Sequence, residues 1–94
     1  MRRDAKIDKN QPEIVAEFER MGAKVKSLAA VGDGFPDLIV ALNGNHLVEV
    51  KGPNGKLRHK QIEFMESWPE PVHIVRERID ATALAQEWQE AKDG

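Results

Sequence analysis

The chain has no cysteine among its 94 residues, and this absence removes three kinds of site. It excludes a disulfide framework, a thiolate zinc site and a cysteine nucleophile. Such a composition is compatible with the reducing interior of a cell, and we expect a cytoplasmic protein.

Long apolar runs are also missing from the sequence. The longest, residues 38–42, is far too short to span a bilayer, and the basic stretch MRRDAKIDKN is not followed by the apolar segment of a secretory signal. We therefore expect no membrane partner. A chain of 94 residues with 40% hydrophobic content can build one modest core, so we predict a single domain over residues 1–94.

An excess of positive charge is absent too, because the formal net charge is −2. A nucleic-acid partner would therefore need a local basic patch. Two runs of basic residues could supply one: Lys56, Arg58, His59 and Lys60, and Arg2, Arg3, Lys6 and Lys9. A charge run is more often simply a solvated face, and we expect disorder in the first eight or nine residues and the last four.

The pattern of apolar and turn-forming residues predicts seven elements. Asn10 is the predicted N-cap of the first helix, with Glu13 completing a capping box, and Asp80 is the predicted cap of a last helix that carries Ile79. Helices are expected over residues 11–21, 57–68 and from 80 onward, and strands over residues 24–30, 37–42, 46–50 and 72–75. This αβββαβα order predicts an α/β fold in which helices pack on a mixed sheet.

Three charged residues lie among the central apolar strands: Asp37, Glu49 and Lys51. Side chains alternate along a strand, so Glu49 and Lys51 share one face. Asn43-Gly44 is a strong hairpin signal, but a two-residue turn there would put Asp37 on the other face. A three-residue loop over 42–44 instead places Asp37 opposite Glu49, with Cβ atoms roughly 4.5–5.5 Å apart. Carboxylates this close repel unless a cation separates them, and we predict the three-residue loop.

Facing carboxylates beside a lysine form an oxygen-ligand site that suits Mg²⁺ or Mn²⁺. Such an ion polarises a phosphoryl oxygen and activates a bound water, while the lysine offsets charge on the phosphate. The pattern therefore predicts phosphodiester hydrolysis. The alternative is an ion pair on a solvated face, but the apolar residues Ile39, Ala41 and Leu47 would share that face.

The same residues resemble the PD-(D/E)XK nuclease superfamily, since Pro36-Asp37 opens one strand and Glu49-Val50-Lys51 closes the next. More narrowly, GFPDL, VEVKG and the downstream Gln61 resemble the VRR-NUC family, whose small stand-alone members occur in phages and bacteria. The Val-Arg-Arg signature itself is absent, because its expected region reads KSLAAVG. The resemblance implies a restriction-endonuclease-like αβββαβ core with a C-terminal helix, working in the cytoplasm of a bacterium or phage-infected cell.

The resemblance also implies roles for the central residues. Asp37 and Glu49 match the metal ligands of the family, and the Val50 main-chain carbonyl matches its third protein contact. Lys51 matches the catalytic lysine.

Four further residues have two interpretations each. Glu13 matches an acid that the first helix of the family contributes to the metal site, but a capping box alone would explain it. Gln61 matches a glutamine of the catalytic site, but a structural hydrogen bond would also explain a polar group on that helix face. Trp68 and Trp88 are expected in the core or at a dimer contact rather than stacked on bases.

The resemblance implies a Mg²⁺- or Mn²⁺-dependent endonuclease that acts on branched or duplex DNA, and we expect Holliday (four-way) junctions as substrate. A chain this short has one site, so a homodimer is expected for two cuts. The alternatives are a nickase or a flap or single-strand nuclease, and a non-catalytic nucleic-acid-binding module or subunit on the same fold.

Overall fold

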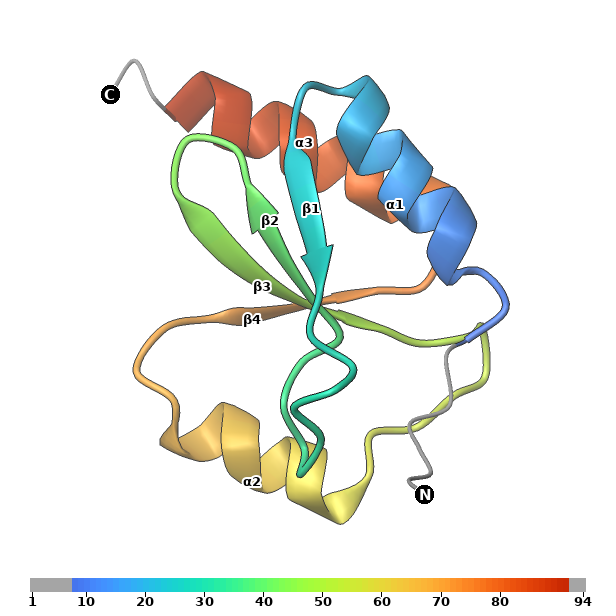
Figure 1. The fold of residues 1–94 in the computed structure, drawn as a ribbon, viewed down its shortest axis with the longest axis vertical. Helices are drawn as coiled ribbons and strands as arrows, with labels where there is room; N and C mark the ends of the chain where they lie inside the picture. The colour runs from blue at the N-terminus through green and yellow to red at the C-terminus, as the bar shows by residue number, and fades with distance from the viewer. Residues whose placement is uncertain (1–7, 92–94) are drawn as a thin grey trace.

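The computed structural model describes residues 8–91, which form helices packed on a four-stranded sheet (Figure 1). The elements in chain order are α1 (Gln11–Arg20), β1 (Lys24–Ser27), β2 (Leu38–Ala41), β3 (Asn45–Val50), α2 (His59–Ser67), β4 (Val72–Val75) and α3 (Arg78–Ala91). The predicted fold class and element order are confirmed, although β1 ends three residues earlier than expected. No helix in this part of the chain is long and apolar enough to cross a membrane.

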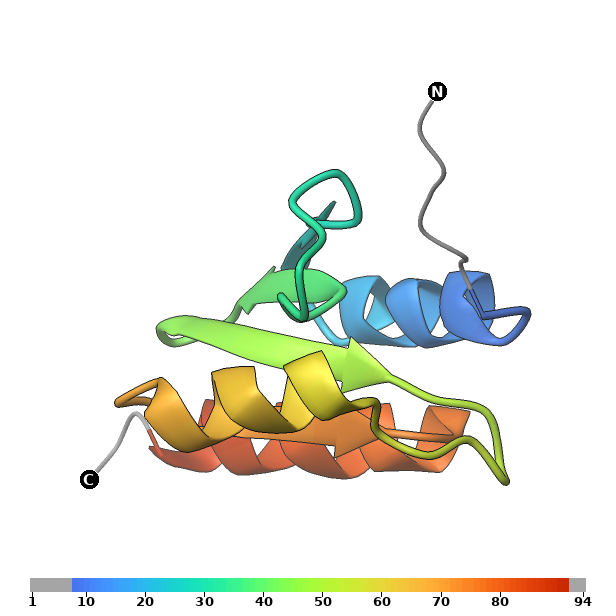
Figure 2. The same cartoon turned by 90° about the horizontal axis from the view of Figure 1, so that it is seen from below.

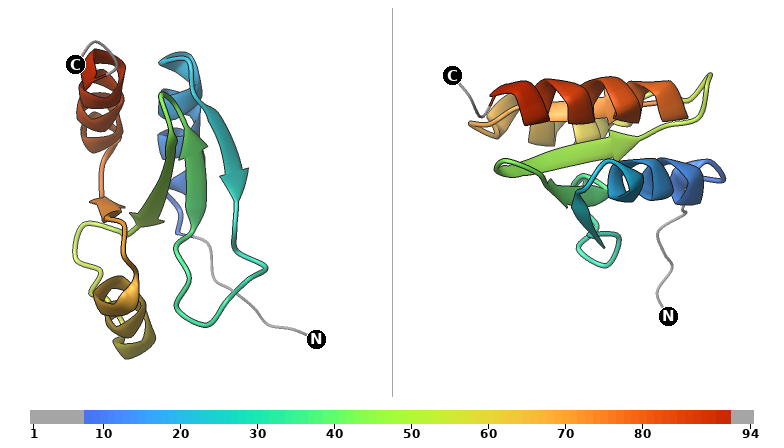
Figure 3. Two further views of the ribbon diagram at one scale, coloured as in Figure 1. Left: turned by 90° about the vertical axis from the view of Figure 1, so that its left-hand side faces the viewer. Right: turned by 90° about the horizontal axis from the view of Figure 1, so that it is seen from above.

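The strands make one mixed sheet in the order β1-β2-β3-β4. The first two neighbouring pairs are antiparallel, whereas β3 and β4 are parallel. A parallel neighbour requires a crossover connection, which α2 supplies. Figures 1 and 3 show α1 and α3 at one end of the long axis and α2 at the other, and β3 crosses the middle of the molecule in Figure 2.

One face of the sheet builds the core together with α1 and α3. Leu38 and Val40 of β2 and Val48 and Val50 of β3 point to this face and are at most 1% exposed. They pack with side chains from both helices, namely Ile14, Phe18, Ala81, Ala85 and Trp88. Full burial of each such large apolar side chain contributes about 1.5–3 kcal/mol. This core fixes which face of β3 is inside, so the residues between its buried valines must point the other way.

The opposite face of the sheet is covered less completely. Ile39 and Leu47 are half-buried there. Phe35, in the loop before β2, packs edge-on against Phe64 of α2 and against Trp68, at ring-centroid distances of 4.9 and 6.0 Å. Trp68 is nevertheless 40% exposed. The helix α2 therefore covers one end of this face through a small aromatic cluster.

The predicted capping box of α1 is wrong. Asn10 does precede the helix, but its side chain makes no capping hydrogen bond. Its amide instead donates to the carbonyl oxygens of Lys51 and Arg76, at 3.1 and 2.8 Å. The Asn10 side chain thus binds two main-chain carbonyls from distant segments instead of capping its own helix.

The predicted start of the last helix is also wrong. The helix α3 begins at Arg78, so Asp80 lies in its first turn rather than before it. The Asp80 carboxylate still serves the helix start, because it accepts the N–H groups of Arg76 and Glu77 at 2.9 and 3.0 Å. Ile79, expected on the apolar side, is 69% exposed.

Candidate active site

The β2–β3 hairpin has the predicted three-residue loop. Residues 42–44 connect the strands, and the last two of them have positive φ angles of 52° and 116°. The Leu42 N–H donates to the Gly44 carbonyl, and Leu38 pairs with Val48. One step further, this register sets Asp37 opposite Glu49. The predicted register is therefore confirmed.

The side chain of Asp37 is tied to the end of β3. Its Oδ2 accepts the main-chain N–H of Val50 at 2.8 Å. Continuing the register by two residues places Pro36 opposite Val50. Proline has no N–H, so the Val50 carbonyl does not receive the donor that a normal antiparallel pair would provide. The Val50 carbonyl oxygen, beside the two carboxylates, therefore lacks this ladder hydrogen bond.

Glu49 is almost fully buried, with 3% exposure, and is held by two side chains. Gln61 donates its Nε2 to Glu49 Oε2 at 2.8 Å, and Lys51 Nζ lies 3.7 Å from the same oxygen. The Oε1 atom of Gln61 accepts the Arg58 N–H at 2.8 Å, which fixes the orientation of the amide. Gln61 therefore makes the structural hydrogen bond that one interpretation expected, and it also contacts Glu49. Its role in a catalytic site stays a prediction.

Burial raises the pKa of both facing carboxyl groups. For Glu49 burial and the negative charge of Asp37 outweigh the opposing effect of Lys51 and raise the pKa to about 8. For Asp37 burial raises the pKa and the hydrogen bond from Val50 partly offsets it. The pair therefore retains a proton near neutral pH.

These groups fit a hard divalent cation. The two carboxylates and the Val50 main-chain carbonyl all offer oxygen ligands, and a positive ion between the carboxylates would replace the proton that the pair retains. Within residues 8–91 no group of three or more Asp, Glu, His or Cys side chains gathers into a fuller cage. Mg²⁺ binds through one or two carboxylates and keeps several waters, so the smaller donor set is sufficient for it.

Glu13 is not brought to this group. Its side chain is exposed in the first turn of α1, and none of the hydrogen bonds or ion pairs described for residues 8–91 joins it to Asp37 or Glu49. Its role as a ligand stays a prediction.

The acid that the sequence reasoning missed is Asp8, whose negative charge also raises the pKa of Asp37 and of Glu49. Asp8 falls in the charged stretch that the sequence suggested was disordered, so no local pattern singled it out.

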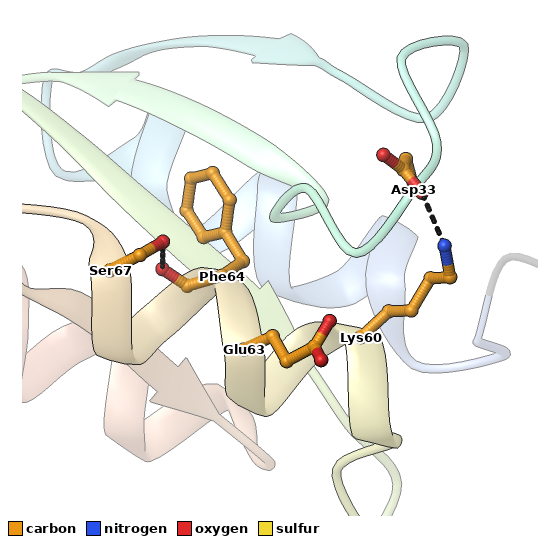
Figure 4. Close-up of a pocket in the computed structure, with 5 residues that line it drawn as sticks. All are labelled: Asp33, Lys60, Glu63, Phe64 and Ser67. Carbon is orange, nitrogen blue, oxygen red and sulfur yellow. Dashed lines mark hydrogen bonds and ion pairs between the residues drawn. The ribbon is translucent and has the colours of Figure 1, made fainter.

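The basic run after β3 is partly neutralised. Lys60 Nζ lies 3.0 Å from Asp33 Oδ1, across a shallow hollow of about 210 Å³ (Figure 4). Asp33 is held there because Gly34 lies against the Lys60 main chain, where a Cβ would come within 2.4 Å of its carbonyl oxygen. His59 similarly pairs with Glu63 at 2.9 Å.

Two members of that run enter none of the ion pairs described for residues 8–91. Lys56 and Arg58 are exposed just beyond the site. In the other predicted run Arg2, Arg3 and Lys6 lie outside the described residues.

Comparison with known proteins identifies the family of this chain. A family model described as the VRR-NUC domain matches residues 4–70, which include all the site residues discussed above. No curated protein matches the chain. Because the match covers well over half of the 94 residues, the chain belongs to the VRR-NUC family and has a nuclease-type domain.

Proposed function

We propose that this protein is a Mg²⁺- or Mn²⁺-dependent endonuclease that hydrolyses DNA phosphodiester bonds. One observation carries the proposal: half-buried Asp37 faces buried Glu49, and Lys51 Nζ lies 3.7 Å from Glu49. Two negative charges this close, one of them buried, are costly to a fold unless a proton or a cation neutralises them. A carboxylate pair beside a lysine is an arrangement that suits phosphoryl chemistry.

The residues would divide the work as follows. Asp37, Glu49 and the Val50 carbonyl would hold the ion, and a further acid, Asp8 or Glu13, would support it. When bound, the ion would polarise the phosphoryl oxygen and lower the pKa of a water molecule. Lys51 would orient that water and offset the charge that develops on the phosphate. Gln61 would keep Glu49 in the orientation needed for binding.

The DNA backbone would lie along the exposed basic residues next to the site. Lys56 and Arg58 follow β3 directly and are solvent-exposed. Neutralising phosphates with such residues releases counterions, which supplies affinity without sequence selectivity. That kind of contact suits a nuclease that recognises the shape of its substrate, and we assign it a four-way junction.

A second copy of the chain would supply the second cut, and the β4 edge is the surface that favours it. This strand, VHIV, carries no formal charge, whereas the other edge strand β1 carries Lys24 and Lys26. Lys51 N–H donates to Val75 O, so the alternating main-chain groups of Ile74 point away from β3. An uncharged edge can pair with itself about a twofold axis without like-charge repulsion.

A cleavage assay tests the function directly. The intact protein is offered a four-way junction, a linear duplex and a single strand, each with Mg²⁺, Mn²⁺ or a chelator. Lys51→Ala is compared with Lys24→Ala, a change of the same type at an exposed position on β1. We expect symmetric junction cuts that are lost with the chelator and with Lys51→Ala but kept in the control.

The other outcomes point to the alternatives. If the protein preferentially cuts single strands, it is a flap or single-strand nuclease rather than a junction nuclease. If it cuts one strand of a duplex, it is a nickase. A protein that binds the junction and cuts nothing with either ion would overturn catalysis in favour of a binding module.

A further inference from the structure

The segment that follows Lys51 folds back onto its side chain. Residues 52–55 form a turn closed by the Gly55 N–H on the Gly52 carbonyl at 3.1 Å. A Cβ placed on Gly55 would lie 3.5 Å from Lys51 Cδ, so the turn runs along the aliphatic part of the lysine. Lys51 itself is only 8% exposed.

Arg76 holds both ends of this turn. Its Nη1 atom donates to the carbonyl oxygens of Gly52 and Gly55, at 2.8 and 2.7 Å. These are charge-assisted bonds, which are roughly twice as strong as those between neutral groups. A single planar nitrogen can satisfy two carbonyls only while the turn keeps its shape, so the arginine selects one conformation of residues 52–55.

Arg76 is itself fixed from both sides. Its N–H donates to Asp80 and its carbonyl accepts the amide of Asn10, which also donates to the Lys51 carbonyl. The Lys51 N–H in turn donates to Val75 O at 3.0 Å. The main chains of Lys51 and Arg76 are therefore linked in two ways. The Asn10 side chain bridges their carbonyl oxygens, and the end of β3 is hydrogen-bonded to the end of β4.

We propose that Arg76 is a positioning residue for Lys51. It keeps the turn over residues 52–55 against the lysine stem and so sets where Nζ lies relative to Glu49. The inference rests on the proposed function, because Lys51 matters to a reaction only if the site is catalytic. Arg76 acts through Lys51 and does not itself meet the phosphate.

The test compares Arg76→Met, which removes the donors but keeps an unbranched stem, with Arg76→Lys, which keeps the charge. Arg78→Met is the control, since Arg78 is exposed two positions further along. We expect Arg76→Met to lower kcat about 10²-fold, the cost of displacing a reacting group by about 1 Å. The KM for DNA and the Kd for Mn²⁺ should stay unchanged, and Arg76→Lys should recover part of kcat.

A second readout does not depend on cleavage. In NMR spectra of lysine-labelled protein, the Lys51 methylene signals should be dispersed in the intact chain and in Arg78→Met, and should collapse toward mobile values in Arg76→Met. If Arg76→Met does not fold, the same two measurements, kcat and the Lys51 methylene signals, are made on Arg76→Lys.

Each contrary result overturns the inference in a recognisable way. An unchanged kcat in a folded Arg76→Met would remove the positioning role, and a raised KM with unchanged kcat would make Arg76 a DNA contact. If the intact protein cuts no DNA, the proposed function fails by itself. Unchanged Lys51 signals in Arg76→Met would then still refute the link between these two residues.

Discussion

Gln61 and Glu49 form a buried hydrogen bond of 2.8 Å between α2 and β3, and the same glutamine accepts the Arg58 N–H at the start of its own helix. Glu49 thus depends for its orientation on an amide that α2 locks in place. The site and the fold share this residue.

Removing the Gln61 amide should therefore weaken metal binding at the site and lower the stability of the fold. We expect Gln61→Ala to weaken Mn²⁺ binding by about 10–100-fold, as removal of a partner behind a metal ligand does. It should also lower the free energy of unfolding by about 1 kcal/mol, because the helix start loses its cap. Calorimetric titration and thermal unfolding measure the two effects. Gln86→Ala, at an exposed position of α3, should change neither, and unaltered Mn²⁺ affinity in Gln61→Ala would separate the glutamine from the metal site.

The Glu49 carboxyl should make the metal-free protein less stable as pH rises. Its pKa is about 8 in the fold against an ordinary 4.5, so between these values the folded state binds more protons than the unfolded chain. Stability must therefore fall with increasing pH across that window. Thermal unfolding from pH 5 to 9 with a chelator should show this decline, and Glu49→Gln should flatten it. A decline that persists unchanged in Glu49→Gln would assign the effect to another group.

Asp8 and Glu13 can be distinguished as the supporting acid. Because the charge of Asp8 acts on both facing carboxyl groups, we expect Asp8→Asn to weaken Mn²⁺ binding more than Glu13→Gln. The two variants remove one charge each from neighbouring positions, so each controls for the other. A larger fall in affinity in Glu13→Gln would restore Glu13 as the ligand.

Salt dependence measures the proposed phosphate contacts. Changing Lys56 and Arg58 together to alanine should reduce the slope of log affinity against log salt by about 2, roughly one unit for each phosphate that is no longer neutralised. The double change Lys24→Ala with Lys26→Ala on β1 is the control for removing two charges. An equal reduction in the control would mean that the effect is one of net charge alone.

The oligomeric state tests the β4 edge. A lysine at position 74 would face its own copy across a twofold axis, so Ile74→Lys should convert a dimer to a monomer in light scattering at a fixed protein concentration. Ile79→Lys makes the same change on α3, where the side chain is 69% exposed, and should leave the mass unchanged. A dimer that survives Ile74→Lys uses another surface, and a monomeric intact protein would contradict the dimer itself.

Much of the site was accessible from local sequence. The Asn43-Gly44 signal limited the hairpin to a few registers, and repulsion between Asp37 and Glu49 selected the one that the structure has. The strand over residues 72–75 and the burial of Trp88 followed from apolar periodicity in the same way. Such predictions succeed because these features depend on interactions between residues that are close in the sequence.

The failures involve partners far apart in the chain. Asn10 looks like a helix cap, but its amide meets carbonyls 41 and 66 positions away. Arg76 carries no motif at all, and its importance depends on where the turn after β3 happens to lie. Nothing in the neighbouring residues encodes such interactions, because they exist only after the sheet has formed.

Pro36 matters to the site because it has no main-chain N–H. Opposite Val50, any other residue would offer an N–H, and the hairpin could grow by one rung at the expense of an oxygen that the proposed ion needs. The N–H of the sheet and the proposed ion would then compete for the same carbonyl oxygen. A substitution such as Pro36→Ala, which looks mild for the fold, would supply that N–H and extend the strand pairing by one residue pair. The length of the paired ladder would then decide whether the Val50 carbonyl is open to the proposed ion.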